Sequence, residues 1–375
     1  MKICLDYQPA VTQRAGIGRY TRVLAEQLPL LMNPEDSLRL FYFDFKGKGE
    51  QPSSLPANVT TKRFRLCPGA IMQKLWNYCS FPSFDMLAGK ADIFHFTNFL
   101  SRPVMKGKVI ASVHDMSFMR YPEFTEEKNL AYLTRGIKRT IGSADAIITI
   151  SKFSAEEIEH FFPAAKGKIF YSHLGIAQNF SPAKDALVTA TKAKYKLDRP
   201  YIITVGTIEP RKNHLLLVDA FEQIAAQGID LVVVGGIGWK SEKIINRLTT
   251  SKYASQIHVL NHLGDGDLPA LYTGASAFAL PSYYEGFGFP PLEAMACGTP
   301  VVSAPGGSLQ EVIADAGIIV SDYNPDAWSN ALTRVISDTH LRESLINKGI
   351  SHVKNFTWDK TVADTLEVYK KVLSI

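Results

Sequence analysis

Two glutamates eight positions apart, Glu285 and Glu293, flank a Gly- and Pro-rich turn in the segment E-G-F-G-F-P-P-L-E. The apolar run Ala277–Pro281 precedes them and predicts a buried strand. Pro290-Pro291 favours a helix start, because proline is tolerated in the first turn, where backbone N–H groups lack partners. We therefore expect Glu285 on the loop before this helix and Glu293 in its first turn.

The N-terminus of such a helix can bind a phosphate, and the two carboxylates can bind hydroxyls of a sugar or a ribose around it. The structural alternative is that Glu293 only complements the helix dipole and that Glu285 is a solvated loop residue. The other motifs of the chain weigh against this alternative.

Two adjacent cations, Arg211 and Lys212, follow the predicted strand Tyr201–Val205 in the segment G-T-I-E-P-R-K-N. Open α/β sheets bind ligands at the edge where their strands end. A planar guanidinium and an ammonium there would neutralise a leaving diphosphate. Adjacent basic residues in a loop are otherwise solvated, and the place directly after a strand favours phosphate binding.

Gly16 and Gly18 lie in G-I-G-R-Y, between a predicted first strand and an apolar-periodic helix. Glycine lets backbone amides come close to a phosphate or a sugar. The dinucleotide fingerprint G-x-G-x-x-G is incomplete, because Thr21 occupies the place of its third glycine. The motif is therefore weak evidence when taken alone.

His114 and Asp115 follow the predicted strand Val109–Val113 and should also lie on the ligand edge. His114 could contact the donor sugar or the acceptor, with Asp115 orienting its ring. A hydrogen-bonded structural histidine is the alternative.

Short apolar runs alternate with longer amphipathic stretches along the chain, which predicts parallel sheets with crossover helices. The runs are continuously apolar, as in strands buried on both faces. The predicted strands are Lys2–Tyr7, Leu38–Phe43, Asp92–Phe96, Val109–Val113, Ala146–Ile150, Lys168–Tyr171, Tyr201–Val205, Asp230–Val234, Gln256–Leu260, Ala277–Leu280, Pro300–Val302 and Ile318–Val320. The predicted helices include Asp185–Leu197, His214–Ala226, Asp326–Ser337, Leu341–Asn355 and Thr357–Leu373.

At 375 residues the chain exceeds the usual size of a single core, so we expect two domains. The composition changes to Ala, Lys, Thr, Asp, Ser and Pro around 176–199, which predicts the boundary. We assign 1–180 to a first domain and 181–355 to a second. Residues 356–375 should form a last helix that crosses back to the first domain, or else caps the second.

The composition is that of a globular protein, 46% hydrophobic and 21% charged, and no run approaches the roughly 18 apolar residues of a membrane span. The chain opens with an acidic Asp6 where a signal peptide has its apolar core. The cysteines, at positions 4, 67, 79 and 297, form no C-x-x-C pair and no zinc-ligand spacing with histidine. We therefore expect a cytoplasmic protein without disulfides or a metal site.

The charge is uneven along the chain. Residues 1–185 hold 24 Lys and Arg against 17 Asp and Glu, and residues 186–375 hold 17 against 19, within a net charge of +5. A basic first half suggests an anionic partner, such as the inner face of the cytoplasmic membrane, although a solvated surface of mixed charge explains it equally well. Nucleic acid is disfavoured, because no run of Lys and Arg interleaved with aromatic residues and no DNA-binding motif spacing is present.

One stretch, from Lys62 to Trp76, is a candidate for docking on a membrane. It interleaves basic with apolar side chains, and a solvated or domain-packing helix is the alternative. The residues concerned are Arg63, Arg65 and Lys74 together with Phe64, Leu66, Ile71 and Leu75.

Taken in order, the motifs resemble those of the retaining glycosyltransferases of family 4. The resemblance covers nearly the whole chain, through G-I-G-R-Y at 16–20, H-D at 114–115, S-K-F-S at 151–154, G-T-I-E-P-R-K-N at 206–213, E-x7-E at 285–293 and F-T-W at 356–358. The glutamate pair and the preceding R-K are specific as a set. The resemblance implies the GT-B architecture, an α/β fold of two Rossmann-like domains whose mainly parallel sheets face each other across a deep cleft. It implies that the first domain, 1–180, lies on the acceptor side and that the second, 181–355, binds the nucleotide sugar.

The resemblance also implies a role for each matched residue. Arg211 and Lys212 would hold the donor diphosphate and stabilise it as the leaving group. Glu285 would bind hydroxyls of the transferred sugar, and Glu293 would bind the ribose. Backbone amides that help to bind the donor would come from Gly286, Phe287 and Gly288, and from Gly16 and Gly18 in the first domain.

His114 would contact the sugar, which makes it the fourth expected catalytic residue beside Glu285, Lys212 and Arg211. The resemblance implies no metal and no other cofactor, because the cations and the helix dipole stabilise the leaving group. The leaving phosphate would accept the acceptor's proton, so no dedicated protein base is expected.

G-I-G-R-Y and H-D-M-S-F most resemble bacterial mannosyltransferases of surface polysaccharide synthesis, which implies GDP-mannose as donor and a saccharide or lipid-linked acceptor. A UDP-sugar, such as UDP-glucose, is the alternative donor. A non-catalytic protein that binds a sugar nucleotide is a further alternative. A glycosidase and a dehydrogenase fit less well, because the first needs no Arg-Lys pair and the second needs the glycine fingerprint.

Overall fold

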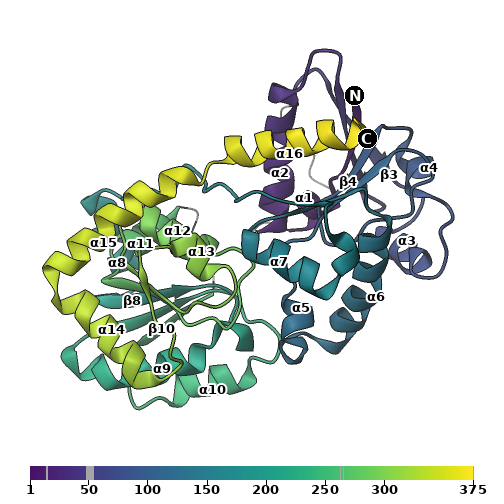
Figure 1. Ribbon diagram of the computed structural model, residues 1–375. Coiled ribbons are helices and arrows are strands. Elements are labelled where there is room, and N and C mark those ends of the chain that lie inside the picture. Colours follow the sequence, from purple (N-terminus) through teal and green to yellow (C-terminus); the bar gives the residue numbers. More distant parts are fainter. Residues whose placement is uncertain (14–15, 48–54, 262, 265, 375) are drawn as a thin grey trace. The chain divides into compact units, whose positions relative to one another are not determined.

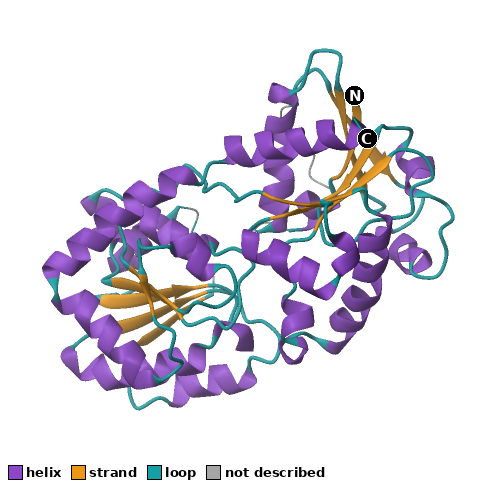
Figure 2. Cartoon of the chain, in the orientation of Figure 1, coloured by secondary structure: helices purple, strands orange, loops and turns teal. Residues whose placement is uncertain are grey.

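The computed structural model describes residues 1–13, 16–47, 55–261, 263–264 and 266–374. The chain divides into two compact units (Figure 1). The first unit comprises Met1–Arg120, Glu127–Gly175 and Trp358–Ile375, and the second comprises Tyr121–Glu126 and Ile176–Thr357. Each unit contains its own parallel sheet with helices on both faces (Figure 2).

The first unit is built on a seven-stranded parallel sheet in the order β3-β2-β1-β4-β5-β6-β7. Its strands are β1 (Lys2–Asp6), β2 (Ser37–Phe43), β3 (Val59–Phe64), β4 (Ile93–Phe96), β5 (Lys108–Ser112), β6 (Ala146–Thr149) and β7 (Ile169–Tyr171). Its helices are α1 (Gln8–Thr12), α2 (Ile17–Leu31), α3 (Gly69–Trp76), α4 (Phe84–Ala88), α5 (Ser117–Arg120), α6 (Glu127–Ser143), α7 (Lys152–Phe161) and α16 (Trp358–Leu373), with a 3₁₀ turn at Pro163–Ala165.

The second unit is built on a six-stranded parallel sheet in the order β10-β9-β8-β11-β12-β13. Its strands are β8 (Tyr201–Val205), β9 (Asp230–Val234), β10 (Ile257–Leu260), β11 (Ala277–Leu280), β12 (Val301–Ser303) and β13 (Ile318–Ile319). Its helices are α8 (Asp185–Lys194), α9 (His214–Ile224), α10 (Glu242–Thr250), α11 (Asp267–Thr273), α12 (Phe289–Ala296), α13 (Leu309–Ile313), α14 (Pro325–Ser337) and α15 (Thr339–His352). Short 3₁₀ turns lie at Pro122–Phe124, Pro210–Lys212, Ala225–Gln227, Ala254–Gln256 and Val353–Asn355.

The central strands form because their side chains are apolar on both faces. Every residue of β9 and β11 is buried, as are all four residues of β4 and β6. Helices on both sides of a parallel sheet demand this pattern. The predicted strands Tyr201–Val205, Asp230–Val234 and Ala277–Leu280 are confirmed with the same bounds.

The last helix, α16, packs in the first unit, beside α2 (Figure 1). Buried hydrogen bonds link it to the sheet, since the Tyr369 hydroxyl lies 2.6 Å from Nδ1 of His95, and Nε2 of His95 lies 2.7 Å from the Ser112 hydroxyl. Thr361 donates to the carbonyl of His173 over 2.8 Å. Within the first unit, α16 therefore completes one face of the sheet.

The sequence reading missed β3, and the candidate docking stretch Lys62–Trp76 is not one helix. The strand β3 lies at the edge of the sheet and only its first residue, Val59, is buried, so it shows no continuous apolar run. The stretch begins in this strand, turns at 65–68 and enters α3 at Gly69. In the described part of the chain, no helix combines the length and the apolarity needed to cross a bilayer.

Candidate active site

Two loops of the second unit bring Arg211, Lys212 and Glu285 together. The first loop follows β8 and makes a 3₁₀ turn at Pro210–Lys212, and the second follows β11 and ends at α12. Because β8 and β11 are parallel neighbours in the sheet, both loops leave the same edge. This is the edge at which open α/β sheets bind ligands.

Both cations contact the same carboxylate. Nζ of Lys212 lies 2.6 Å from Oε1 of Glu285, and Nη1 of Arg211 lies 2.9 Å from Oε2. The side chains of Lys212 and Glu285 are about one-tenth exposed, and that of Arg211 about one-fifth. An ammonium has three N–H donors, so Lys212, which donates to Glu285, keeps donors for a second anion.

The charges in this cluster determine the ionisation of Glu285. Burial by itself would raise the pKa of its carboxyl, but Arg211 and Lys212 more than offset this and lower the pKa from 4.5 to about 2. Glu285 is therefore an ionised carboxylate at neutral pH. Its backbone is also fixed, because its carbonyl accepts hydrogen bonds from the N–H and the hydroxyl of Ser308.

Two glycine positions make room for this arrangement. Gly206 has a φ of +147°, and a Cβ there would lie 3.0 Å from Cε and 3.2 Å from Nζ of Lys212. Gly307 has a φ of +69°, and a Cβ there would lie 2.2 Å from the carbonyl oxygen of Glu285. Side chains at these positions would displace the cation or the loop that carries the carboxylate.

The helix α12 starts one residue earlier than the sequence indicated, which corrects the expected place of Glu293. Gly288 is its N-cap, with a φ of +117°, and Phe289 is its first residue. The helix thus begins before the two prolines, and Glu293 lies beyond the first turn, at the fifth helical position. The Glu293 side chain is buried, with Oε2 3.4 Å from the Tyr272 hydroxyl.

The loop between Glu285 and α12 contains the expected amide donors Gly286, Phe287 and Gly288, in the turn that leads to the helix N-terminus. The hydroxyl of Ser308 donates to the carbonyl of Phe287 over 2.8 Å, which holds this turn in place. All three residues directly follow Glu285 in the sequence. Their role as donors to a ligand stays a prediction.

Of the site residues expected in the first unit, His114 lies in an apolar, buried environment and not in a cluster of charges. His114 is buried after β5, and its Nε2 lies 2.8 Å from the carbonyl oxygen of Thr97, so this nitrogen is the protonated one. Burial lowers the pKa of His114, against the opposing effects of the Thr97 carbonyl and Asp115. The ring packs edge-on against Tyr20 and Phe99. His114 is therefore a neutral imidazole.

Asp115 does not orient His114, contrary to our expectation. Its Oδ1 accepts hydrogen bonds from the N–H of Ser117 at 2.9 Å and from the Ser117 hydroxyl at 2.7 Å, which places the carboxylate at the start of α5. The Thr97 carbonyl orients the imidazole instead. This partner could not be foreseen, because it is a backbone atom 17 positions away.

Gly16 and Gly18 differ in what surrounds them. Gly16 is the exposed N-cap of α2, with a φ of +56° and open space where a Cβ would point. Gly18 is buried, and a Cβ there would lie 1.9 Å from the carbonyl oxygen of Gln13. Gly18 thus has a packing role between α2 and α1, whereas a side chain at Gly16 would meet no described atom within 4 Å.

Sequence reasoning gave no role to Glu209, which is almost fully buried beside the cation pair. Its Oε1 accepts from Nη2 of Arg211 over 2.6 Å, so that Arg211 spans two carboxylates. The only signal was an acidic residue two positions before an arginine in a loop that follows a strand. Such a position is solvent-exposed in most loops.

The described residues contain no cluster of three His, Cys, Asp or Glu side chains that could hold a metal ion. The charges that face the ligand edge of the second sheet come instead from Arg211 and Lys212. Their positive charge and the N-terminus of α12 can stabilise a leaving diphosphate by electrostatics alone. A metal-independent reaction stays our expectation.

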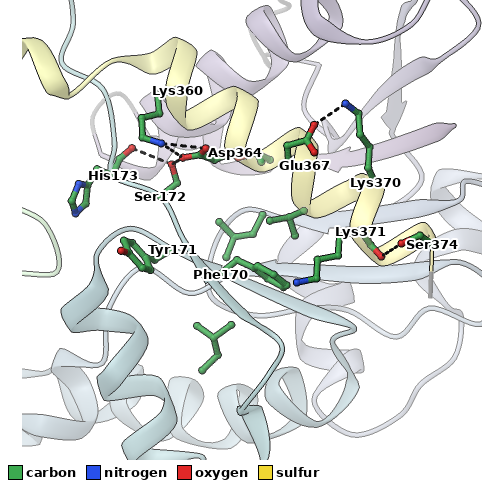
Figure 3. Close-up of a pocket in the computed structure, with 14 residues that line it drawn as sticks. Phe170, Tyr171, Ser172, His173, Lys360, Asp364, Glu367, Lys370, Lys371 and Ser374 are labelled. Atoms are coloured by element: carbon green, nitrogen blue, oxygen red, sulfur yellow. Dashed lines mark hydrogen bonds and ion pairs between the residues drawn. The ribbon is translucent and has the colours of Figure 1, made fainter.

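The described part of the first unit has at least two cavities. One, of about 280 Å³, lies at the carboxyl edge of its sheet and is lined by Asp6, Gln8, Pro9, Thr12, Phe43, Gly69, Ala70, Gln73, Asn98 and Arg102. The other, of about 1000 Å³, is a groove between β7 and α16 (Figure 3). Phe170, Tyr171 and several lysines of α16 line the groove.

Comparison with known proteins agrees with this architecture. Residues 189–352 match the family of group 1 glycosyl transferases. The chain is 29% identical over 381 residues to an O-antigen chain mannosyltransferase B of Escherichia coli, covering 99% of this chain and 100% of that protein. It is 31% identical over 257 residues to a D-inositol 3-phosphate glycosyltransferase of Salinispora tropica, covering 64% of this chain and 53% of that protein.

Among solved structures, sucrose-phosphate synthase from Thermosynechococcus elongatus superposes with a TM-score of 0.79 at 20% identity, over 100% of this chain and 99% of that one. At this identity the likeness concerns the fold alone. The motifs, the two parallel sheets and the full-length relative agree on one class of enzyme. The chain carries a group 1 glycosyltransferase domain at 189–352 and has the GT-B fold, which makes it a glycosyltransferase.

Proposed function

We propose that this chain transfers a mannosyl residue from GDP-mannose, with retention of anomeric configuration, to a saccharide or lipid-linked acceptor in bacterial surface polysaccharide synthesis. The observation that carries the proposal is the buried cluster in which Arg211 and Lys212 converge on Glu285 at the ligand edge of the second sheet. Two cations at this edge suit the negative charge of a sugar nucleotide's diphosphate.

In this proposal the bond between the anomeric carbon and the diphosphate oxygen breaks, and its electron pair stays on the diphosphate. Arg211 and Lys212 stabilise the charge that develops there. The acceptor's hydroxyl oxygen bonds to the anomeric carbon on the same face, and its proton passes to the leaving phosphate oxygen. The role proposed for Glu285 is to hold both cations in place and to accept a hydrogen bond from a hydroxyl of the transferred sugar.

The other matched residues complete the proposed donor site. Glu293, on α12, would accept from the ribose hydroxyls, and the amides of Gly286, Phe287 and Gly288 would donate to the sugar or the phosphate. Gly16 would bring the N-terminus of α2 near the phosphates, with Gly18 letting this helix pack. His114, held as a neutral imidazole, would contact the sugar through Nδ1, because Nε2 is engaged with Thr97.

The choice of GDP-mannose as donor rests on similarity to a named relative. The relative that matches over its full length is named an O-antigen chain mannosyltransferase B. A UDP-sugar is the second candidate donor. A D-inositol 3-phosphate glycosyltransferase that matches over about half of its own length is named for a different acceptor class.

A panel of GDP, UDP, ADP and their mannose and glucose conjugates, added without metal in a thermal-shift assay, tests the donor. Ligand binding to the folded state raises the apparent stability by mass action, by about 2.7 kcal/mol at a hundredfold excess over Kd. A selective shift with GDP and GDP-mannose supports the proposal. A shift with UDP and its conjugates alone would mean that the donor is a UDP-sugar instead of GDP-mannose. No shift with any nucleotide would contradict nucleotide-sugar transfer altogether.

We further propose that the protein sits peripherally on the anionic inner face of the cytoplasmic membrane. The segment 66–81 of the first unit exposes five large apolar side chains, with exposed fractions from 40 to 84%. They are Leu66, Ile71, Leu75, Tyr78 and Phe81. Lys74 lies on the same helix as Ile71 and Leu75, so apolar and cationic groups occur together, which suits an interface with anionic lipid.

Part of the predicted docking stretch has a different role. The ring of Phe64 packs against Phe41 and Phe43. Arg63 and Arg65 lie within 4.0 Å and 3.7 Å of Asp44. The proposed membrane surface therefore starts at Leu66 and extends past Trp76.

Sedimentation with anionic liposomes at low salt tests this surface. Wild-type protein should be retained and released as salt rises, because screening weakens the attraction of Lys and Arg to lipid. Ile71→Ser/Leu75→Ser should lose retention, and Leu187→Ser, at an exposed leucine of the second unit, should keep it. Equal retention of both variants, or no retention of the wild type at low salt, contradicts membrane contact.

A further inference from the structure

Glu209 is a buried acid at the ligand edge of the second sheet that the proposed reaction does not use. Only 3% of its surface is exposed. Its loop is tied to the loop after β9, because the N–H of Ile208 donates to the carbonyl of Gly236 over 2.9 Å and the N–H of Gly238 donates to the carbonyl of Ile208 over 3.0 Å. The carbonyl of Glu209 also accepts from the N–H of Lys212 over 3.1 Å. The backbone therefore holds this carboxylate beside the cation pair.

The guanidinium of Arg211 lies between the carboxylate of Glu209 and the loop that carries Glu285. Its Nη2 lies 2.6 Å from Oε1 of Glu209, and its Nη1 lies 2.9 Å from Oε2 of Glu285. Nη1 also donates to the carbonyl of Tyr284 over 2.5 Å, and the N–H of Tyr283 donates to the carbonyl of Arg211 over 2.9 Å. Hydrogen bonds that involve charged groups are stronger than neutral ones. Glu209 thus holds Arg211 from one side, and the Glu285 loop holds it from the other.

Four charged side chains make up this cluster, and their formal charges cancel. Glu209 and Glu285 contribute two negative charges, and Arg211 and Lys212 contribute two positive ones. The most exposed of the four side chains, that of Arg211, is 22% exposed, so water and salt screen the cluster only in part. Without the charge of Glu209, two positive charges and one negative would remain, a net charge of +1.

We propose that Glu209 is a positioning residue that holds Arg211 against Glu285, and that its charge weakens the attraction of the cluster for a diphosphate. The inference rests on the proposed function, because it assumes that the diphosphate of a sugar nucleotide binds at this cluster. Attraction that acts equally on the bound donor and on the transition state does not raise kcat. The same attraction also holds the nucleoside diphosphate product, which must leave before the next turnover. A negative charge beside Arg211 therefore favours product release while both cations stay in place.

A purely structural role for Glu209 predicts the opposite change in binding. Removal of an acid that only supports the loop would weaken nucleotide binding, whereas removal of an opposing charge should strengthen it, because the anion then meets a net positive cluster. Glu209→Gln suits this comparison, since the amide oxygen of glutamine can still accept from Nη2 of Arg211. Tyr284 and Glu285 also continue to hold the guanidinium in this variant.

Isothermal titration calorimetry with GDP and with UDP, on the full chain at low salt and without metal, tests the inference. Glu209→Gln should bind the nucleotide that the wild type prefers at least about fivefold more tightly, and added salt should shrink this difference because it screens the charge. Glu242→Gln, at an exposed glutamate of α10, should bind as the wild type does. Equal or weaker binding by Glu209→Gln, at an unchanged melting temperature, overturns the inference and leaves the proposed function standing.

A second variant carries the test if Glu209→Gln lowers the melting temperature. Glu209→Gln/Arg211→Gln removes one charge of each sign and leaves neither partner of the ion pair buried and unpaired. It should bind the nucleotide within about fivefold of the wild type, because the two losses offset each other. A greater loss would show that only the cation of Arg211 acts on the nucleotide, and would overturn the inference. Binding of neither nucleotide by the wild type contradicts the proposed function itself, and this inference with it.

Discussion

Lys212 and Glu285 are 73 positions apart in the sequence, and Nζ of the first lies 2.6 Å from Oε1 of the second. The contact joins the loop after β8 to the loop after β11 and fixes the ammonium at the ligand edge of the sheet. Arg211 binds the other oxygen of the same carboxylate. Glu285 thus positions two cations at once, which places them before any donor arrives.

Replacing Lys212 by Met should reduce kcat at least about a hundredfold, because loss of one preorganised charge donor costs about 10²- to 10³-fold. The side chain keeps its length, and Arg211 still neutralises Glu285. We expect a fall in stability of about 1–3 kcal/mol, measured by urea denaturation. Lys243→Met, at an exposed lysine of α10, should change neither quantity, and an unchanged kcat in Lys212→Met would remove the ammonium from the reaction.

Glu285→Gln should make stability less dependent on pH in acid. The pKa of folded Glu285 lies at about 2, below its ordinary value of 4.5, so the carboxylate stabilises the folded state above pH 4.5. This contribution, of about 3 kcal/mol, is lost as the pH falls from 4.5 towards 2.

The measurement is the free energy of unfolding of wild type and variant by urea at several pH values. Their difference should shrink across this window. Glu242→Gln, at an exposed glutamate of α10, should parallel the wild type. A constant difference between wild type and Glu285→Gln would show that the carboxylate is not held by the cations.

Gly206→Ala should lower the kcat of sugar transfer, because it displaces the side chain of Lys212. Its φ of +147° and the 3.0 Å approach of Lys212 Cε mean that a methyl group strains the backbone and displaces the ammonium. Gly228→Ala is the matched control, because Gly228 has a φ of +80° and open space around the Cβ position. Both variants should lose about 1–3 kcal/mol of stability from backbone strain, and only Gly206→Ala should lose kcat. Equal kcat in the two variants would contradict the inference that Gly206 makes room for a catalytically active Lys212.

Gly18→Ala should destabilise the first unit whether or not a donor is bound. A Cβ at Gly18 would overlap the carbonyl oxygen of Gln13, and overpacking of this kind costs about 1–3 kcal/mol or more. Gly142→Ala, in α6 with open space, is the control and should be neutral or stabilising. If Gly18→Ala instead raised the donor KM without changing the melting temperature, Gly18 would contact the donor directly.

Transfer should persist in excess EDTA and should not rise with added Mg²⁺ or Mn²⁺. The reason is that Arg211, Lys212 and the N-terminus of α12 provide the positive charge that a divalent ion would otherwise bring to the diphosphate. Initial rates with and without chelator provide the measurement. A loss of activity in EDTA that Mg²⁺ restores would make the reaction metal-dependent.

The strands could be predicted because their residues are apolar on both faces, as in β8, β9 and β11. The strand β3 could not, since four of its six residues are exposed and its apolar pattern is broken by Thr60, Thr61, Lys62 and Arg63. The start of α12 was misplaced because the Gly288 N-cap, rather than the prolines, sets it. The pattern of apolar residues therefore predicted the buried strands. It did not predict the exposed edge strand β3 or the first residue of α12.

For the site, the sequence indicated which loops carry Arg211, Lys212 and Glu285, because each follows a buried strand. It could not show that one carboxylate binds both cations, since this contact depends on the order of strands in the sheet. It also could not show that Thr97 orients His114, or that Asp6 and Arg102 share a cavity. These relationships join segments that only the tertiary fold brings together.

Mass spectrometry of acceptor glycans after incubation with GDP-mannose shows whether the cations at Glu285 take part in sugar transfer, when wild type is compared with Lys212→Met and Lys243→Met. We expect the wild type and Lys243→Met to add hexose to the acceptor with consumption of GDP-mannose, and Lys212→Met to yield at most about one-hundredth of the product. Equal hexose transfer by Lys212→Met would contradict this expectation, because the cluster at Glu285 would then have no part in the reaction.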